Sequence, residues 1–427
     1  MNSGDESSST STFPLSEEEI ADENEVNVEF TKTEKYKEGD REVTPLNDDW
    51  HTCETARLDT TQSLESEAMV VRLSPDYSFC AVGLANGDIR LFHLNGTRKT
   101  GLTVRLKDPG ETLPCTDIRF FHNIPSATSS EMQCILCSYA SGFVRLWNYT
   151  LPSSRTALKT TWKEYVFRED ENDDRGKQDA NHILCLSISF DNRRFITGGK
   201  DAYIRVYEKG WSNECRLLRP KIHSFESLGH TSRITALVYH PRGKEDRRYL
   251  PIFISASWDD SIQVWHDQQG SSLWQIYGTY VAGNDGLDID PTKNIILTCS
   301  WRRENSLVQL WPFPDFLIEG EGEITERENV SYKRPLSRFV YEPLKQVTRG
   351  YVAKFDAHYK LILYAGSNKN LVSILDIENN TVVAEVTHLD NGVYSGAVFR
   401  DPETPNQLLI IYTSGKGVSL GKINMNT

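Results

Sequence analysis

Short runs in which apolar and polar residues alternate, each closed by turn residues, follow one another through most of the chain. The run Val70–Leu73 leads into Pro75, for example, and the run Ile234–Tyr239 leads into Pro241. An apolar residue at every second position, followed by Pro, Asp or Asn, is typical of antiparallel strands joined by tight turns. The pattern therefore predicts an all-β fold from about residue 67 onwards.

These runs belong to a unit that recurs about every 50 residues. In each copy, a strand that ends in small residues is followed by a tight turn and then by a second apolar strand. In the first five copies the second strand ends in an aromatic residue. Seven copies predict seven four-stranded blades of a β-propeller. The copies are Ala81–Phe92, Ser141–Trp147, Gly199–Tyr207, Ser255–Trp265, Cys299–Trp311, Gly366–Asp376 and Ser414–Leu420.

The fourth copy resembles the repeat of the WD-repeat β-propeller family. It has a Gly-His pair before its first strand, with His230, and then Ser255, Asp259 and Trp265. The resemblance implies a buried hydrogen-bond relay within this blade. Asp259 would orient the His230 imidazole, which would reach Ser255, and Ser255 would accept a hydrogen bond from the Trp265 indole. The resemblance covers roughly residues 51–425 and implies a seven-bladed ring.

The other copies depart from this repeat. The third retains Asp201, but the remaining blades are expected to depend more on apolar packing. An eighth, degenerate blade could lie within residues 318–346. We favour a long insertion there, because the segment is charged and lacks the turn-to-aromatic pattern. The residues that replace the turn Asp elsewhere are Asn86, Ser141, Asn305 and Lys369.

The first 50 residues differ in composition from the rest. They hold fifteen acidic and four basic residues, so that −11 of the net charge of −13 lies there. With few large apolar groups to offset the entropy of ordering, residues 1–50 are predicted to be a disordered acidic tail, and residues 51–427 to form the propeller. In this family an N-terminal strand closes the ring, and we assign that strand to Thr52–Leu58.

Composition also argues against several classes of protein. No run of 18 apolar residues occurs, which argues against a membrane span, and the N-terminus lacks the apolar core of a signal peptide. We therefore expect an intracellular protein, cytoplasmic or nuclear. No dense block of Lys and Arg marks a nucleic-acid surface. The eight cysteines lie mostly in apolar runs and are predicted to be buried free thiols.

Motifs for catalysis or for metal binding are missing. Cys134 and Cys137 have the spacing of a zinc pair, but they point to opposite faces of a strand and no second pair follows. The segment Gly283–Gly286 is a turn-like run rather than a phosphate loop. Asp288 and Asp290 could share one strand face, although a structural role is favoured. We predict no enzyme activity, no cofactor and no metal.

Aromatic and Arg residues beside the turns and at the beginnings of strands are the candidates for binding. In a propeller these positions lie at the rims of the central channel, and such residues dominate binding hot spots. Packing against neighbouring blades is the alternative for the tryptophans. The candidates are Tyr139, Lys200, Trp258, Trp301, Arg302 and Arg303 in the turns, and His182, Arg233, Tyr351 and Tyr394 at strand beginnings.

These observations favour a non-catalytic scaffold that is monomeric by itself and binds peptides or protein surfaces at the channel mouth within a multiprotein complex. A substrate receptor of a ubiquitin ligase is the alternative. Such family members often carry Trp-Asp-x-Arg after the third strand, and here Trp147, Trp265 and Trp311 begin different sequences. A propeller enzyme or lectin would need acidic or metal-binding residues that converge at the mouth, and none is identified.

Overall fold

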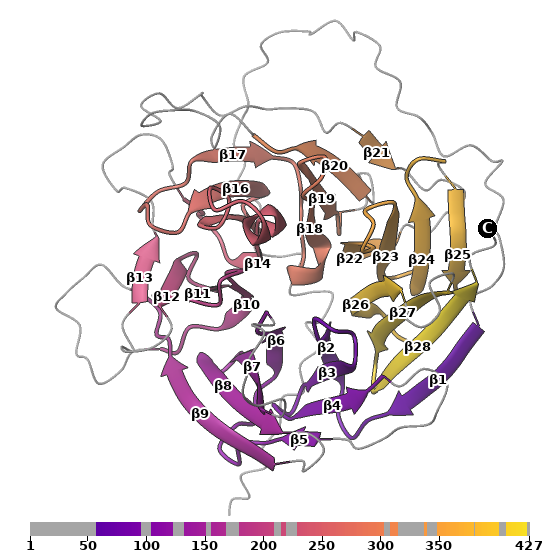
Figure 1. Ribbon diagram of the computed structural model, residues 1–427, viewed down its shortest axis with the longest axis horizontal. Helices are drawn as coiled ribbons and strands as arrows, with labels where there is room; N and C mark the ends of the chain where they lie inside the picture. The colour runs from indigo at the N-terminus through magenta and orange to yellow at the C-terminus, as the bar shows by residue number, and fades with distance from the viewer. Residues whose placement is uncertain are drawn as a thin grey trace, which may run out of the picture. The chain divides into compact units, whose positions relative to one another are not determined.

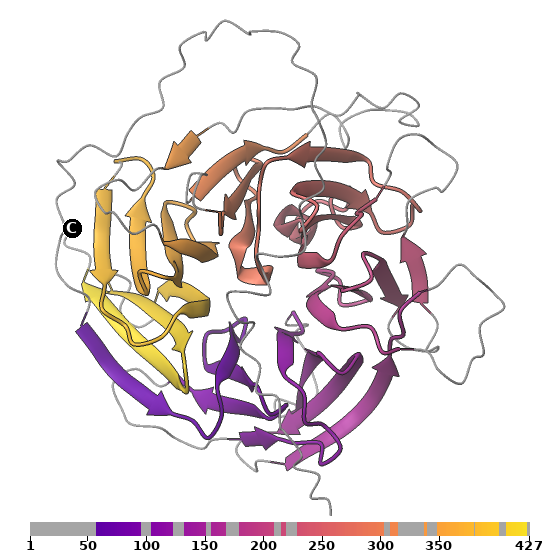
Figure 2. The ribbon, with the colours of Figure 1, turned by 180° about the vertical axis from the view of Figure 1, so that it is seen from behind.

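Seven four-stranded antiparallel sheets form a ring in the computed structural model of this protein, as Figures 1 and 2 show from the two sides. The two helical elements among the described residues are single 3-10 turns, η2 (Pro241–Lys244) and η3 (Asn284–Gly286). The predicted seven-bladed, all-β propeller is therefore confirmed. The structure describes residues 57–94, 104–122, 132–150, 155–167, 179–208, 215–218, 229–302, 308–314, 337–339, 348–379, 381–400 and 407–424.

Each of the first four blades consists of consecutive strands, ordered from the channel outwards. Blade one contains β2 (Ala68–Leu73), β3 (Phe79–Leu84), β4 (Ile89–His93) and β5 (Val104–Leu106). Blade two contains β6 (Cys115–Phe120), β7 (Met132–Tyr139), β8 (Phe143–Thr150) and β9 (Arg155–Lys163). Blade three contains β10 (Ile183–Ile188), β11 (Arg194–Gly199), β12 (Ile204–Glu208) and β13 (Cys215–Leu218). Blade four contains β14 (Ile234–Tyr239), β15 (Ile252–Ser257), β16 (Ser261–His266) and β17 (Trp274–Tyr277).

The last three blades follow the same order until the ring closes. Blade five contains β18 (Leu287–Asp290), β19 (Ile295–Cys299), β20 (Val308–Pro312) and β21 (Ser337–Phe339). Blade six contains β22 (Arg349–Phe355), β23 (Leu361–Ser367), β24 (Leu371–Asp376) and β25 (Thr381–Val386). Blade seven contains β26 (Val393–Arg400), β27 (Gln407–Ser414), β28 (Gly417–Asn424) and β1 (Arg57–Ser63). Strand β21 shows that the segment considered for an eighth blade supplies the outer strand of blade five.

Ring closure joins the two ends of the propeller. Strand β1 pairs antiparallel with β28, and the two lie side by side in Figure 1. The described strand extends to Ser63, five residues beyond the predicted end at Leu58, because it covers the edge of β28 as far as Gly417. Residues 52–56 of the predicted strand lie outside the described residues. So does the tail at residues 1–50, whose disorder stays a prediction.

Neighbouring blades share their cores. All six residues of β3 and all six of β15 are buried, since each sheet is covered on both faces. Trp311 and Phe313 of blade five pack in one cluster with Ile262 and Val264 of blade four. A single blade could not bury its apolar faces alone, and this is why the repeats are stable only as a ring.

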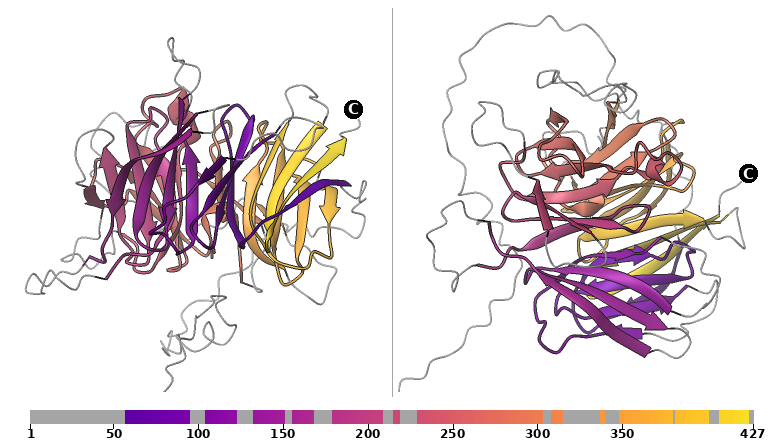
Figure 3. Two further views of the ribbon diagram at one scale, coloured as in Figure 1. Left: turned by 90° about the horizontal axis from the view of Figure 1, so that it is seen from below. Right: turned by 60° about the vertical axis from the view of Figure 1, so that its left-hand side comes forward.

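The strand order places equivalent positions of every blade at the same edge of the ring. In blade one, Ala68 at the start of the first strand pairs with Leu84 at the end of the second, and Gly83 pairs with Ile89 at the start of the third. We call this edge the top face and the opposite edge the bottom face. The left view of Figure 3 shows the strands running between the two faces.

A β-bulge interrupts the first strand of six blades close to the top face. The register shifts between Ala68 and Val70 in blade one, and the same irregularity recurs in blades two, three, four, six and seven. A bulge inserts an extra residue and turns its side chain away from the regular alternation. Met69, Tyr351 and Tyr394 lie within these bulges.

Candidate partner-binding surface

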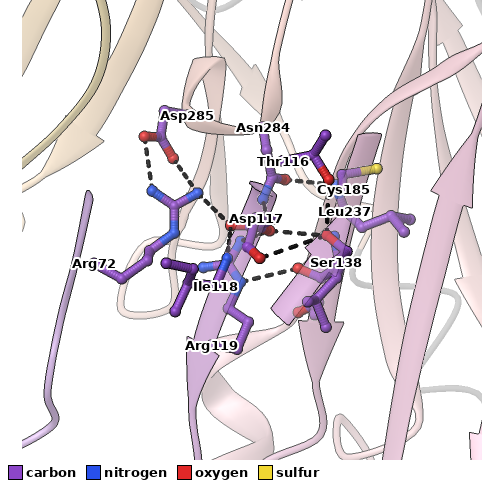
Figure 4. A network of polar contacts seen from close by, with 12 residues as sticks. Arg72, Thr116, Asp117, Ile118, Arg119, Ser138, Cys185, Leu237, Asn284 and Asp285 are labelled. Carbon is purple, nitrogen blue, oxygen red and sulfur yellow. Dashed lines mark hydrogen bonds and ion pairs between the residues drawn. The ribbon is translucent and has the colours of Figure 1, made fainter. Parts of the chain in front are cut away.

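A polar network joins η3 to the innermost strands at the centre of the ring (Figure 4). The Asn284 side-chain amide donates to Asp117 of blade two, and its oxygen accepts the Leu237 N–H of blade four at 2.9 Å. Asp285 pairs with Arg72 of blade one at 2.8 Å and accepts from the Ser395 hydroxyl of blade seven. Two residues that precede blade five therefore contact four other blades.

Asp117 is a second residue on which several contacts of this network converge. Its carboxylate lies 2.7 Å from the Arg72 guanidinium and 3.2 Å from that of Arg119, and it accepts the Leu186 N–H of blade three at 3.2 Å. Burial alone would lower the pKa of Arg72, but the charges of Asp117 and Asp285 outweigh it and raise that pKa. The groups at the centre are therefore charged and paired with one another.

Lys354 brings blade six into the same network. Its ammonium lies 3.9 Å from Asp285 and donates to the Leu287 carbonyl at 2.7 Å. Burial would raise the pKa of Asp285, but the charges of Arg72 and Lys354 lower it. The central network therefore joins the blades to one another. The faces of the ring remain as the surfaces that a partner protein could contact.

Sequence reasoning missed this role of Asn284 and Asp285, which it assigned to a simple turn. The one signal in the sequence was a pair of polar residues between two glycines, directly before an apolar strand. The two nearby carboxylates also have structural partners. Asp288 accepts the Phe355 N–H of blade six at 3.0 Å, and Asp290 accepts the Thr292 N–H of its own turn at 2.7 Å.

The relay residues of blade four lie in one chain of hydrogen bonds. The Asp259 carboxylate is 2.8 Å from His230 Nδ1, and His230 Nε2 is 2.6 Å from the Ser255 hydroxyl. The Trp265 indole N–H donates to the same hydroxyl at 2.7 Å. Burial would raise the pKa of Asp259, but its contacts with His230 lower it. This chain ties the loop before blade four to the turn at the top face.

Blade three uses a buried Glu where blade four uses His. Glu164, in the loop before β10, accepts from the hydroxyls of Thr197 and Tyr207, which occupy the places of Ser255 and Trp265. Arg205 lies 3.5 Å from Glu164 and 2.6 Å from the turn residue Asp201. An ion pair thus replaces the imidazole of the relay.

Blade two repeats this substitution, whereas in blade one the corresponding Glu65 is 44% exposed. Glu111 pairs with Arg145 of blade two and accepts from the Ser141 hydroxyl at 2.7 Å, and Glu65 pairs with Arg90 of blade one at 2.6 Å. Blades one, two and three thus add a Glu–Arg pair to the apolar packing that is expected of blades without the relay. In each, a Glu before the first strand meets an Arg of the third strand, two elements that no local sequence pattern connects.

Large apolar side chains that remain exposed gather on the top face. Among the described residues six such side chains are between 37% and 50% exposed, and all but Leu158 lie at this face by their position in the blades. Met69 and Tyr394 are turned outwards by bulges. The other three side chains at this face lie in turns or loops. Exposed apolar groups collected on one side of a molecule mark interaction surfaces. The top-face residues are Met69, Leu113, Tyr165, Trp258 and Tyr394.

Trp258 contacts both an Arg and a second Trp on this face. The Arg233 guanidinium carbon is 4.2 Å from the Trp258 ring centroid, and the centroid of the Trp301 ring lies 6.4 Å from it. Arg302 is 4.2 Å from the Tyr280 ring centroid and 5.6 Å from that of Trp301. The two tryptophans therefore pack on each other across blades four and five, yet Trp258 keeps 37% of its surface exposed.

The other predicted binding residues differ in where they lie. Tyr351 and Tyr394 meet edge to face at 4.9 Å across blades six and seven, and Lys200 is exposed beside His182 on blade three. Tyr139 is only 1% exposed and packs in the core, which removes it from any surface. The candidate Arg303 lies outside the described residues.

The described ranges contain neither a metal-binding cluster nor a membrane-spanning helix. No group of three or more His, Cys, Asp or Glu side chains there is arranged to hold a metal ion. No helix in the same ranges is long and apolar enough to cross a membrane. The six cysteines that can be assessed are free thiols, and five of them are buried, as expected from their apolar surroundings.

Comparisons with known proteins agree with the fold. The family described as "WD domain, G-beta repeat" matches residues 175–208 and 220–266. Pre-mRNA-processing factor 19 of Bos taurus is 27% identical over 168 residues, which is 37% of this chain and 28% of that protein. The same factor from Mus musculus and from Rattus norvegicus is 25% identical over the same length. The chain thus spans less than a third of these relatives. Seven four-stranded blades in a closed ring, together with repeat matches in blades three and four, support the WD-repeat β-propeller family for this chain.

Proposed function

We propose that this protein is a non-catalytic scaffold that binds peptides or protein surfaces through its top face within a multiprotein complex. A WD-repeat propeller is a protein-interaction fold, and the choice of face comes from the surface itself. The gathering of exposed large apolar side chains on the top face is the observation that carries the proposal. Apolar anchors beside Arg are the composition of binding hot spots.

The buried network at the centre supports the top face over the channel as the binding region. Arg72, Asp117 and Asp285 have their charges paired inside the protein, so they offer a partner little. Trp258, Trp301 and Tyr394 are held by contacts with neighbouring blades and therefore lose little rotamer freedom when a partner covers them.

The comparisons suggest a setting for this scaffold. Relatives over part of the chain are named as pre-mRNA-processing factors, and we propose by analogy a nuclear complex that acts on RNA precursors. The propeller itself is proposed to bind proteins in that complex rather than nucleic acid. A cytoplasmic complex is the other intracellular setting consistent with the proposal.

Affinity purification of the full chain with and without the double substitution Trp258→Ala/Trp301→Ala tests the proposed surface. Leu158→Ala is the matched control, because Leu158 is equally apolar and 41% exposed but lies away from the top face. We expect the double variant to lose at least one partner that the control retains, with both variants melting close to the wild type. If both variants retain the same partners, the top face around Trp258 is not the binding surface.

A further inference from the structure

We propose that the top face over blades three to five selects an acidic peptide segment, whose carboxylates pair with Lys200, Arg233 and Arg302 while an adjacent apolar side chain packs on Trp258 and Trp301. This inference rests on the proposed function and adds the chemistry of the partner. The region formed by these five residues is called the cationic arc below.

The arginines of the cationic arc are oriented by aromatic rings. Arg233 stacks over Trp258, and Arg302 stacks over Tyr280, each with its guanidinium carbon 4.2 Å from the ring centroid. A stacked guanidinium uses its flat face against the ring and keeps its N–H groups at the edge for a carboxylate. The stacking therefore prepares both arginines for bidentate pairing.

Among the described residues, few acidic side chains form ion pairs with these cations. Across the described parts of the chain, Arg233 and Lys200 form no ion pair. Arg302 meets Asp260 at 3.8 Å, well beyond the usual length of a charge-assisted hydrogen bond. Among the described residues, the partly buried Asp260 is thus the one carboxylate that forms an ion pair with any of these three cations.

Other carboxylates of the same turns are already engaged. Asp201 is buried against Arg205 at 2.6 Å, and Asp259 is held by His230 at 2.8 Å. Each of these two carboxylates therefore ties together elements of its own blade and is not available to pair with the cations of the arc. The pKa of His182, next to Lys200, is lowered by partial burial and by the charges of Lys200 and Arg233. The positive charges of the arc therefore disfavour the protonated form of the neighbouring His182.

The positive charge of the arc and its two tryptophan rings together determine which class of ligand fits it. A basic segment would meet like charges on Lys200, Arg233 and Arg302, which is costly at an interface. A small inorganic anion would pair with the arginines but leave Trp258 and Trp301 without a contact. An acidic segment with an apolar or aromatic side chain uses both features of the arc at once.

Selection of random short peptides displayed on phage against the immobilised full chain tests this inference. The Trp258→Ala/Trp301→Ala variant serves for counter-selection, so that only sequences that need the arc are kept. We expect the recovered sequences to be enriched in Asp and Glu beside an apolar residue. Recovery of neutral or basic sequences, or of none, overturns the inference. Neutral or basic sequences that still need the tryptophans would leave the proposed function intact.

The binding of one recovered peptide, labelled with fluorescein, is then measured by anisotropy. Arg233→Glu and Arg302→Glu are each compared with Arg193→Glu, which makes the same charge change at an 85% exposed Arg on the bottom face. We expect each arc variant to weaken binding about tenfold or more, and the control to leave it unchanged. Equal weakening by all three variants, or by none, contradicts direct pairing with the arc.

Discussion

Removal of the Asp285 carboxylate should destabilise the whole ring, because this one side chain joins blades one, five and seven. Asp285 is buried, pairs with Arg72 at 2.8 Å and accepts from Ser395 and from the Gly396 N–H at 3.3 Å. Breaking a buried ion pair by deleting one partner costs about 3–5 kcal/mol. Since Arg72 keeps Asp117 at 2.7 Å, we expect Asp285→Ala to cost about 3 kcal/mol, near the lower limit of this range.

Asp117→Ala should cost more than Asp285→Ala. Asp117 is fully buried and serves both Arg72 and Arg119, and its loss also removes acceptors for Asn284 and the Leu186 N–H. We therefore expect a loss of about 5 kcal/mol, at the upper limit of the range for a broken buried pair. Against a total stability of about 5–15 kcal/mol, such a variant would unfold at markedly lower urea concentration.

Urea unfolding followed by tryptophan fluorescence measures both effects. Asp246→Ala is the control, because Asp246 pairs with Arg248 at 2.7 Å on the surface of the protein. The urea concentration at which this variant is half unfolded should equal that of the wild type. If Asp285→Ala unfolds at the same urea concentration as the control, the central network does not hold the blades together.

Three further outcomes are expected. The pKa of Asp285 is lowered below its ordinary 3.8, so this carboxylate takes up a proton in the unfolded chain at a higher pH than in the folded protein. The stability that it contributes is therefore lost as pH falls below 3.8. In acid unfolding followed by circular dichroism, Asp285→Asn should lack this contribution to the decrease of stability with pH. Ser255→Ala leaves the buried Trp265 indole without an acceptor and should cost about 1–3 kcal/mol in thermal unfolding, and more than Thr298→Ala, because Ser255 also serves the relay histidine. Burial raises the pKa of the Cys80 thiol to about 12, so iodoacetamide should label Cys80 only after unfolding, and rapid labelling of Cys80 in the native protein, located by peptide mass spectrometry, would contradict its burial.

Local patterns in the sequence were enough to predict the architecture. Alternation of apolar residues identifies strands, and the recurring strand–turn–strand unit counts the blades, because both depend on residues close together in the chain. The residues of the blade-four relay could be named for the same reason, since His230, Asp259 and Trp265 all belong to one repeat. Arg233, Trp258 and Trp301 were likewise found from their positions beside turns.

Contacts between distant segments needed the folded ring. Arg72 and Asp285 are 213 residues apart, and Glu164 reaches Arg205 from the loop before its blade, so neither pair has a repeating spacing. Exposure was also decided by the fold: Tyr139 lies beside a turn as Trp258 does, but the neighbouring structure buries it completely. Local periodicity therefore determined how many blades form, while the closure of the ring decided which side chains pair at its centre and which remain exposed on its top face. The physical reason is that charge pairing and burial depend on distances between blades, and these distances exist only once all seven blades have packed.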